Sequence, residues 1–373
     1  MTISNPLKRL ADFGQAFWWD TLSRAGLRDG GVVRMRDVNG MRGITSNPTI
    51  FQKAIAASSD YDDAIAAFAR EGQEPAAIFW KLAVQDIQEA CDQLAPVHQA
   101  TGGRDGFVSL EVDPHLAFDP DGTIAEVRRL WAEVSRPNLM IKIPGTPPCV
   151  PAIRQALIEG FNINVTLLFS QQAHVEVMHA FIGALEERRR RGDAVDSVHS
   201  VASFFVSRVD TNIDAKLGRM HSEQAERLKG RAAVANAKLA YQNFLQVFSG
   251  ERWETLRAAG AHVQRPLWAS TSTKDPSYPD VIYVEELIGS DTVNTMPTAT
   301  VEAYLDHGQP EADRVLHGID EARQHLDSLE RMGIPMERVT AELLEEGVEK
   351  FAHSFDDLLA AVQRKANELA RNH

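Results

Sequence analysis

Short apolar runs alternate along the chain with longer stretches in which apolar residues recur at helical spacing. Such short runs, rich in Val, Ile, Leu and Phe, are typical of buried strands, whereas the longer pattern indicates amphipathic helices. Eight strands are predicted, at residues 15–20, 41–47, 107–112, 138–144, 161–169, 200–206, 266–271 and 291–297. Helical patterns fill the intervals at 21–29, 60–95 (more than one helix), 123–135, 149–158, 171–190, 208–248, 279–287 and 300–328.

The regular alternation of strands and helices determines the predicted fold class. Consecutive parallel strands need a crossover of about a dozen residues or more, and a helix supplies it. Eight such units in series predict an α/β fold, specifically a (β/α)8 TIM barrel. An open doubly wound sheet is the alternative interpretation, but no GxGxxG motif follows the first strand to mark a dinucleotide site.

The tail at 331–373 carries further apolar residues at helical spacing. It is expected to form one or two C-terminal amphipathic helices that pack on the barrel. No stretch rich in Pro, Gly or Ser is long enough to separate two domains, and the sequence has no internal repeat. We therefore predict a single domain over residues 1–373.

The charge balance excludes some classes of protein. The 373 residues include 39 Lys and Arg against 52 Asp and Glu, a formal net charge of −13, which argues against a nucleic-acid partner. The longest apolar runs are much shorter than the roughly 20 residues of a membrane-spanning helix. The amino-terminal sequence lacks the apolar core of an export signal, so a cytoplasmic protein is expected. Cys91 and Cys149 are interpreted as buried, inert thiols, and the spacing of His174 and His179 indicates no metal site.

Lys142 is unusual because it lies inside an apolar strand, NLMIKIPGT at 138–146. Burial disfavours the charged form of an amine, and a neutral amine is the nucleophile that forms a Schiff base with a carbonyl compound. A strand-end lysine that extends its amine to solvent is the alternative interpretation. The polar residues of the other strands bear on this choice.

Polar residues stand at the carboxyl ends of nearly all the predicted strands. In a TIM barrel these ends meet at one face and carry the active site, whereas a barrel core that is merely filled gains nothing from groups that cost desolvation. Phe205 shares the strand parity of Ser203 and is expected to line the same pocket. The residues predicted to converge are Asp20, Asn47, Glu111, Lys142, Asn164, Thr166, Ser203, Ser270 and Asn294.

These residue types fit chemistry at a carbon–carbon bond. An iminium on Lys142 withdraws electrons, so the bond β to it breaks once a base removes the hydroxyl proton of the departing fragment. Asp20 is the candidate base, and Glu111 with Thr166 is expected to hold a water that carries protons. The structural alternatives are a helix N-cap for Asp20 and a surface ion pair for Glu111.

Six segments of the sequence resemble the transaldolase family. They are GITSNPTIF (43–51), LEVDPHLA (110–117), NLMIKIPGT (138–146), GFNINVTLLFS (160–170), SVASFFVSRVD (200–210) and VNTMPTATVEAYLDHG (293–308). The segments occur in the family's order from about the first strand to the eighth, so the resemblance is specific. The stretch PLWASTSTKDPSYPDVIYVEEL (266–287) is similar to the long bacterial subgroup.

The resemblance implies a class I aldolase-type barrel with its Schiff base on Lys142. The implied reaction transfers a dihydroxyacetone unit from sedoheptulose 7-phosphate to glyceraldehyde 3-phosphate, giving erythrose 4-phosphate and fructose 6-phosphate, with no metal or organic cofactor. The resemblance also matches Asp20 to the family's acid–base aspartate, Glu111 to its active-site glutamate and Thr166 to its water-positioning threonine. It further implies that Asn47 and Asn164 bind the dihydroxyacetone unit and that Ser203 and Arg208 bind phosphate.

The sequence departs from shorter transaldolases after the seventh strand, where those proteins carry an arginine. Here Ser270 is followed by Thr271, Ser272, Thr273 and Lys274. Ser270 is a candidate substrate contact, and Lys274 is a candidate second cation for the phosphate. A loop lysine that faces solvent is the alternative interpretation of Lys274.

Two other functions compete with transfer. Fructose 6-phosphate aldolases resemble this chain but carry glutamine at the position of Glu111 and tyrosine at that of Phe205, so the residues present favour transfer. A catalytically silent sugar-phosphate sensor is the alternative from another class, and the retention of Lys142, Asp20 and Glu111 argues against it. The predicted partners are sugar phosphates, whereas the sequence leaves the oligomeric state open.

Overall fold

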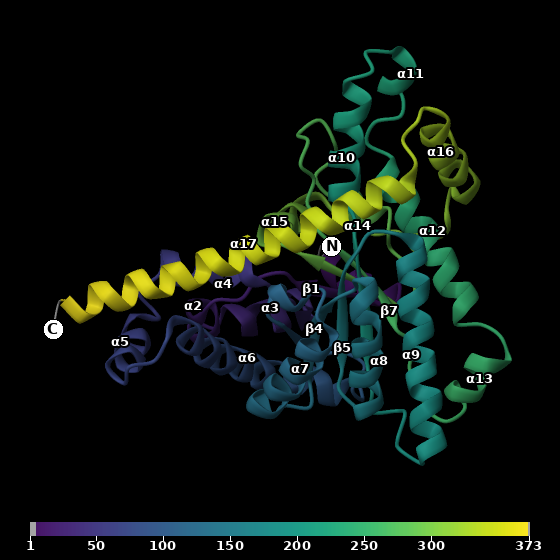
Figure 1. Ribbon diagram of the computed structural model, residues 1–373. Helices are drawn as coiled ribbons and strands as arrows, with labels where there is room; N and C mark the ends of the chain where they lie inside the picture. The colour runs from purple at the N-terminus through teal and green to yellow at the C-terminus, as the bar shows by residue number, and fades with distance from the viewer. Residues whose placement is uncertain (1–4, 372–373) are drawn as a thin grey trace.

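Eight parallel strands close into a barrel in the computed structural model, which describes residues 5–371 (Figure 1). The strands follow one another in chain order, and β1 pairs with β8 to close the barrel. The (β/α)8 prediction is confirmed, because each predicted strand corresponds to an observed one. The strands are β1 Gln15–Trp19, β2 Gly43–Ile44, β3 Phe107–Glu111, β4 Leu139–Pro144, β5 Ile163–Leu168, β6 Ser200–Phe205, β7 Arg265–Ala269 and β8 Thr292–Met296.

Strand β2 is much shorter than the predicted segment 41–47, because the chain turns into helix α4, Pro48–Ala57. Asn47 caps this helix, and its Oδ1 accepts a hydrogen bond from the Ile50 N–H at 3.0 Å. Pro48 occupies the first turn, where its fixed φ and missing N–H suit a helix start. The apolar pattern does not predict α4, although this Asn-Pro pair signals its start.

The predicted helical intervals contain more helices than the apolar pattern indicates. Gly30 and Gly40 adopt left-handed φ angles of 78° and 75° and separate α3 from its neighbours. Such breaks depend on backbone angles that apolar periodicity does not report. The other helices up to β8 are α1 Pro6–Asp12, α2 Arg24–Arg28, α3 Gly31–Asn39, α5 Asp62–Arg70, α6 Pro75–Ala100, α7 Pro120–Val134, α8 Val150–Glu159, α9 Gln171–Arg191, α10 Ser207–Gly218, α11 Glu223–Glu226, α12 Ala232–Val247, α13 Glu251–Arg257 and α14 Ile282–Glu285.

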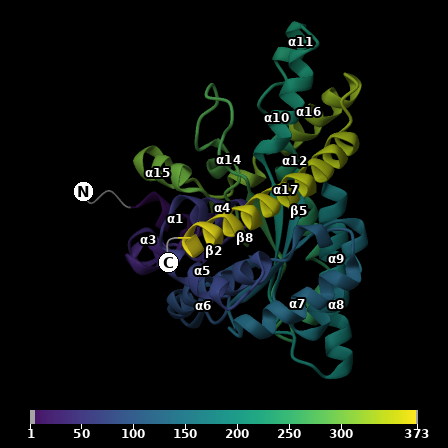
Figure 2. The same ribbon diagram turned by 60° about the vertical axis from the view of Figure 1, so that its left-hand side comes forward.

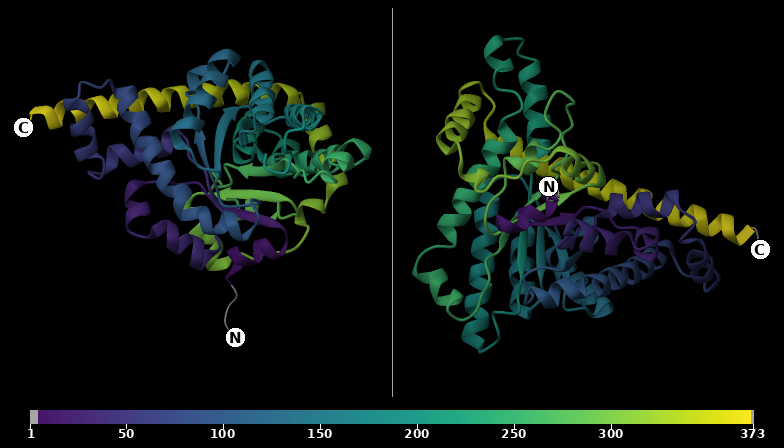
Figure 3. Two further views of the ribbon diagram at one scale, coloured as in Figure 1. Left: turned by 90° about the horizontal axis from the view of Figure 1, so that it is seen from below. Right: turned by 180° about the vertical axis from the view of Figure 1, so that it is seen from behind.

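The segment after β8 forms α15 Thr298–His307, α16 Ile319–Arg331 and the long α17 Met336–Arg371. Helix α17 contacts α4, α5, α6 and α10, and it crosses the structure so that its carboxyl end projects beside α5 (Figures 1 and 3). On one side of the barrel, α10, α11 and α16 form a projection (Figure 2). Within residues 5–371, no helix is both long and apolar enough to span a bilayer.

The barrel interior is filled by alternate residues of each strand. Trp18, Gly43 and Phe107 are register partners on neighbouring strands, and all three are buried. The next residue, Trp19, instead donates from Nε1 to Thr298 Oγ1 of α15 at 3.2 Å. Strand alternation therefore places Trp18 inside the barrel and Trp19 against the outer helices.

Gly43→Ala is expected to destabilise the barrel by about 1–3 kcal/mol through overpacking. A Cβ at this position would lie 2.5 Å from two atoms of the Trp18 indole. Trp18 is itself fully buried, so its ring has little room to move away. Urea unfolding measures the change in the free energy of unfolding. Gly183→Ala in α9 is the control, because its Cβ would meet no atom closer than 3.5 Å, and it should stabilise slightly.

His174 in α9 is fully buried, and both of its ring nitrogens are without a hydrogen-bond partner among the described residues. Burial lowers the pKa of His174 from 6.5 to about 4, so the unfolded chain binds a proton at a pH where the folded protein does not. Stability should therefore fall as the pH falls from about 6.5 to about 4, by up to about 3 kcal/mol.

His174→Leu removes this titration without leaving a polar atom unpaired. Its free energy of unfolding should depend less on pH between 4 and 6.5 than that of the wild type. Parallel pH profiles for both proteins would contradict the assignment.

Candidate active site

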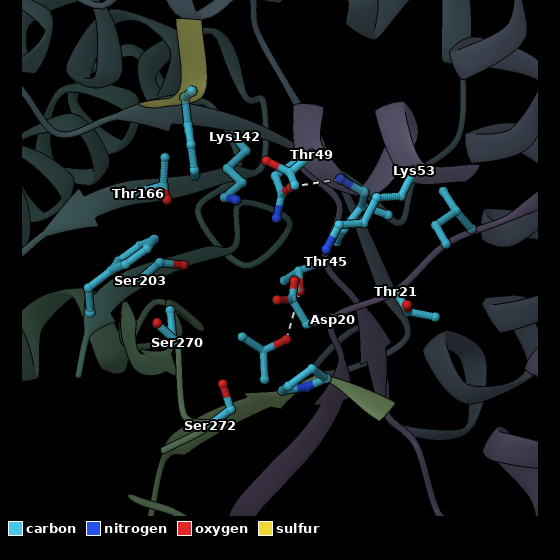
Figure 4. Close-up of a pocket in the computed structure, with 18 of the residues that line it drawn as sticks. Asp20, Thr21, Thr45, Thr49, Lys53, Lys142, Thr166, Ser203, Ser270 and Ser272 are labelled. Atoms are coloured by element: carbon cyan, nitrogen blue, oxygen red, sulfur yellow. Dashed lines mark hydrogen bonds between the residues drawn. The ribbon is translucent and has the colours of Figure 1, made fainter. Parts of the chain in front are cut away.

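A cavity of about 590 Å³ opens at the carboxyl ends of the strands (Figure 4). All the predicted site residues line it except Glu111 and Asn164, which are buried deeper in the barrel, and Asn294. The lining residues that matter below are Asp20, Thr45, Asn47, Lys53, Lys142, Thr166, Ser203, Phe205, Arg208, Ser270, Ser272, Lys274, Thr295 and Phe351. The predicted convergence of strand-end residues is therefore present in the structure.

Lys142 points into this cavity from the middle of β4 and is only 5% exposed, so its alternative interpretation as a solvent-directed lysine is wrong. Its Nζ lies 3.1 Å from Glu111 Oε2 and donates to the Ser46 carbonyl at 3.3 Å. Glu111 and Asn164 are its register partners on β3 and β5, so all three side chains share one level of the barrel. The surroundings of this amine are thus both apolar and acidic.

Glu111 is 3% exposed, which excludes a surface ion pair. Burial raises the pKa of Glu111, and the nearby Lys142 opposes this shift. A carboxylate with a raised pKa is a stronger base, so Glu111 is placed to accept a proton within the site. Within the described part of the chain, neither carboxylate oxygen of Glu111 has a hydrogen-bond partner, so its contact with Lys142 is an ion pair.

Asp20 follows β1 directly and faces the same cavity. Its Oδ1 accepts a hydrogen bond from Thr45 Oγ1 at 2.7 Å, and Thr45 lies 2.7 Å from the Thr295 hydroxyl. Burial raises the pKa of Asp20, against the lowering effect of Lys142 and Thr45. The alternative N-cap role is wrong, because Ser23 caps the next helix.

Thr166 and Asn164 project inward from β5 at neighbouring levels. Asn164 is fully buried; it donates to Ser109 Oγ at 3.0 Å and accepts from Ser203 Oγ at 2.7 Å. Its predicted contact with substrate stays a prediction. Thr166 Oγ1 is buried, has no partner among the described residues and borders the cavity, where it is available to a water molecule.

Three cations border the cavity besides Lys142. Arg208, at the start of α10, lies over the Phe205 ring at 5.2 Å and the Phe351 ring at 5.9 Å, and burial lowers its pKa. Lys274 donates to Ser272 Oγ at 2.6 Å, and burial and the charge of Arg208 lower its pKa. The third cation, Lys53 of α4, points into the cavity from the side opposite Ser203 and Ser270 (Figure 4). The cavity thus gathers positive charge within an acidic protein.

Two further predicted residues lie at the cavity wall. Asn47 uses Oδ1 to cap α4, which leaves its amide N–H groups for a ligand. Ser270 adopts a left-handed φ of 57°, and its hydroxyl lies 2.9 Å from that of Ser207. The position of Asn294 corrects another prediction: this residue faces away from the cavity and donates to the Tyr283 carbonyl, and its neighbour Thr295 lines the site instead.

Sequence reasoning missed Thr45, Lys53, Thr295 and Phe351. Strand alternation could have identified Thr45 and Thr295, because residues two apart on a strand face the same side. Thr45 is two residues beyond the inward-facing Gly43, and Thr295 is two beyond the inward-facing Val293. Lys53 is one helical turn beyond Thr49, which also lines the cavity. No local signal identifies Phe351, because α17 brings it from the far end of the chain over Lys142, 5.6 Å from ring centre to Nζ.

Comparisons with known proteins agree with this geometry. A sequence model of the family described as Transaldolase/Fructose-6-phosphate aldolase matches residues 17–362. A Transaldolase of Thermobifida fusca is 48% identical over 99% of both chains, and Transaldolase 1 of Streptomyces avermitilis is 46% identical over 97% of both. A Transaldolase of Mycobacterium marinum is 46% identical over the full length of both chains. The chain therefore belongs to the transaldolase/fructose-6-phosphate aldolase family.

Proposed function

We propose that this protein is a transaldolase that transfers a dihydroxyacetone unit from sedoheptulose 7-phosphate to glyceraldehyde 3-phosphate. The observation that carries the proposal is the buried Lys142 amine, 3.1 Å from a Glu111 carboxylate and in one cavity with Asp20. Relatives named Transaldolase match the chain over nearly its whole length, which supports the same conclusion. Because α17 contributes Phe351 to the cavity, we further propose that the chain works as one domain.

The first half of the proposed reaction cleaves the donor. Glu111 takes a proton from Lys142, and the neutral amine attacks the ketose C2 carbonyl to form a carbinolamine. Loss of water gives the iminium, and a water molecule held by Glu111 and Thr166, whose buried oxygens lack partners among the described residues, relays the proton. Asp20 then removes the C4 hydroxyl proton, the C3–C4 bond breaks, and its electron pair moves toward the iminium nitrogen. Erythrose 4-phosphate departs and an enamine remains on Lys142.

The second half builds the product. The enamine carbon attacks the aldehyde carbon of glyceraldehyde 3-phosphate, and the new C–C bond restores the iminium. Asp20 returns its proton to the aldehyde oxygen, which becomes a hydroxyl. Water then adds to the iminium, and fructose 6-phosphate and the free Lys142 amine are released. Every proton that Asp20 takes is therefore returned within one cycle.

The competing aldolase activity would release dihydroxyacetone to water. The aromatic ring of Phe205 lines the cavity without a hydroxyl group, and Phe351 lies over Lys142, so the enamine is covered by apolar surface. Because this apolar surface excludes water, it slows protonation and hydrolysis of the enamine and leaves time for an aldehyde acceptor to bind. Free dihydroxyacetone should form much more slowly from fructose 6-phosphate alone than transfer proceeds with an acceptor present.

Borohydride trapping tests the Schiff base. Incubation with fructose 6-phosphate and sodium borohydride should reduce the iminium and leave a stable three-carbon adduct on Lys142, located by peptide mass spectrometry. Lys53 enters the same cavity and serves as the internal comparison. An adduct on Lys53 or on any other lysine would refute the assignment, as would the absence of any adduct.

Arg208→Ala should weaken the binding of phosphorylated substrates while sparing the imine. Arg208 presents a guanidinium to the cavity, and its Nη1 is buried without a partner in the described residues. Loss of a charge-assisted contact of about 1.5–3 kcal/mol predicts a roughly 10- to 100-fold rise in KM for glyceraldehyde 3-phosphate. Steady-state kinetics gives KM, and trapping at saturating donor reports the imine. An unchanged KM would remove Arg208 from the phosphate site.

A further inference from the structure

A second cavity, of about 210 Å³, opens at the amino-terminal end of the barrel, the end opposite Asp20. Phe107, Ser200 and Arg265 border it, and each is the first residue of its strand. Phe107 and Met140 form apolar wall, together with Trp253 of α13, which is 2% exposed. The proposed transfer reaction uses none of these residues.

Three arginines converge on this cavity and retain free donor groups. Arg265 is 6% exposed, and its Nη2 donates to Asp105 at 2.9 Å and to the Arg104 carbonyl at 2.8 Å. The side chain of Arg104 is half exposed at the rim of the cavity, and it forms an ion pair with Asp291 at 2.5 Å. Arg257 of α13 also lines the cavity and forms an ion pair with Glu254. A guanidinium carries five N–H donors, so these ion pairs leave several of them for a ligand.

Two histidines complete the wall. The His199 and His262 rings stack with centroids 4.9 Å apart and planes inclined by 23°. Neither ring makes a hydrogen bond within residues 5–371, so their nitrogens are not committed to a protein partner. Two uncommitted imidazoles beside guanidinium groups form a wall rich in hydrogen-bonding groups.

The electrostatic field at these rings is positive. Burial, together with the charges of His262, Arg265 and His98, lowers the pKa of His199 to about 3. Burial, Arg104 and Arg265 also lower the pKa of His262, and Asp196 and Asp291 oppose this. The charged and titratable groups around the pair are His98, Arg104, Asp105, Asp196, Arg257, Arg265 and Asp291. Burial disfavours any ion here, but the positive charges that contribute to these shifts favour an anion over a cation in the same space.

We propose that this cavity binds a small anion whose phosphate or carboxylate group is held by Arg104 and Arg265 beside the two histidines. The planar guanidinium matches either group with two parallel hydrogen bonds. The apolar wall at Trp253 suits a short carbon chain attached to the anionic group. This site is separate from the active site and does not depend on the transfer reaction.

Histidine NMR tests the proposal with inorganic phosphate as the probe. Protein labelled at the histidine Cε1 position is titrated with phosphate at constant pH and ionic strength, with chloride as the balancing anion. His262→Gln and His199→Asn assign the two resonances. Both should shift saturably with phosphate, and the pKa of each ring should rise when the site is filled. Acetate in a parallel titration distinguishes a phosphate site from a carboxylate site, and saturable binding of either supports the proposal.

Arg104→Gln is the decisive variant, because Arg104 is half exposed and its loss should leave the fold intact. It should weaken anion binding at least about tenfold, the value of one charge-assisted contact, and leave transfer activity unchanged. Arg208→Ala is the control for anion binding in the active site, and the histidine shifts should persist in it. The proposal is overturned if neither anion shifts the two resonances saturably, if Arg104→Gln binds as the wild type does, or if Arg208→Ala abolishes the shifts.

Discussion

Lys142→Met is expected to lower kcat for transfer by at least about 10⁴-fold and to abolish the borohydride adduct. Methionine keeps an unbranched apolar stem but has no nitrogen that can add to a carbonyl. The cavity holds the amine of Lys53 as well, but that side chain lies on α4 and has no ion-pair partner among the described residues. Coupled kinetics and mass spectrometry measure both effects.

Stability needs its own control in this experiment, because Lys142→Met leaves the buried Glu111 without its cation. Removing one member of a buried pair commonly costs about 3–5 kcal/mol. The double variant Lys142→Met/Glu111→Gln replaces both charges and should recover most of that loss while staying inactive. If the double variant regained activity, or if the single variant retained it, Lys142 would not be the nucleophile.

Asp20→Asn is expected to lower kcat by about 10²–10⁴-fold, the usual contribution of a general acid–base group. The amide has nearly the shape of the carboxylate and still accepts the hydrogen bond from Thr45, so the fall in kcat would reflect the missing base rather than a changed site geometry. Imine formation precedes the proposed step of Asp20, and borohydride trapping of the donor should therefore continue. A variant that cleaves the donor at the wild-type rate would exclude Asp20 as the base.

The pH profile gives a second measure of Asp20. Its raised pKa means that the carboxylate, the form needed for proton abstraction, is lost as the pH falls through that raised value. Activity should therefore decline on the acidic side at a higher pH than an ordinary aspartate would require. Thr45→Val removes a hydrogen bond that lowers the pKa of Asp20, so the acidic limb should move to still higher pH. If the acidic limb of the Thr45→Val profile does not move, the titration belongs to a group other than Asp20.

Local sequence pattern predicted the barrel and much of the candidate site. Apolar runs separated by helical patterns gave all eight strands, since a parallel strand buried on both faces has few places for polar residues. Lys142 and Asp20 stood out for the same reason, because each interrupts or ends such a run. Parity along a strand also placed Phe205 and Ser203 on the cavity side, as observed.

Strand parity gave the wrong cavity residue on β8, where the exact register was needed. Asn294 and Thr295 are adjacent, and a shift of one residue exchanges the cavity side for the outer side. Only the pairing of β7 with β8, in which Leu267 is opposite Val293, shows that Thr295 faces inward. The same holds for the depth of Asn164, whose amide is engaged by Ser109 and Ser203 below the cavity.

The sequence by itself therefore predicted the eight strands, the barrel as the favoured fold and most of the residues at its catalytic face, because these follow from local apolar periodicity. The tertiary structure alone decided which distant groups meet. The 3.1 Å approach of Glu111 to Lys142 and the placement of Phe351 over that amine join segments far apart in the chain. Contacts of this kind depend on strand register and helix packing, and neither leaves a local pattern in the sequence.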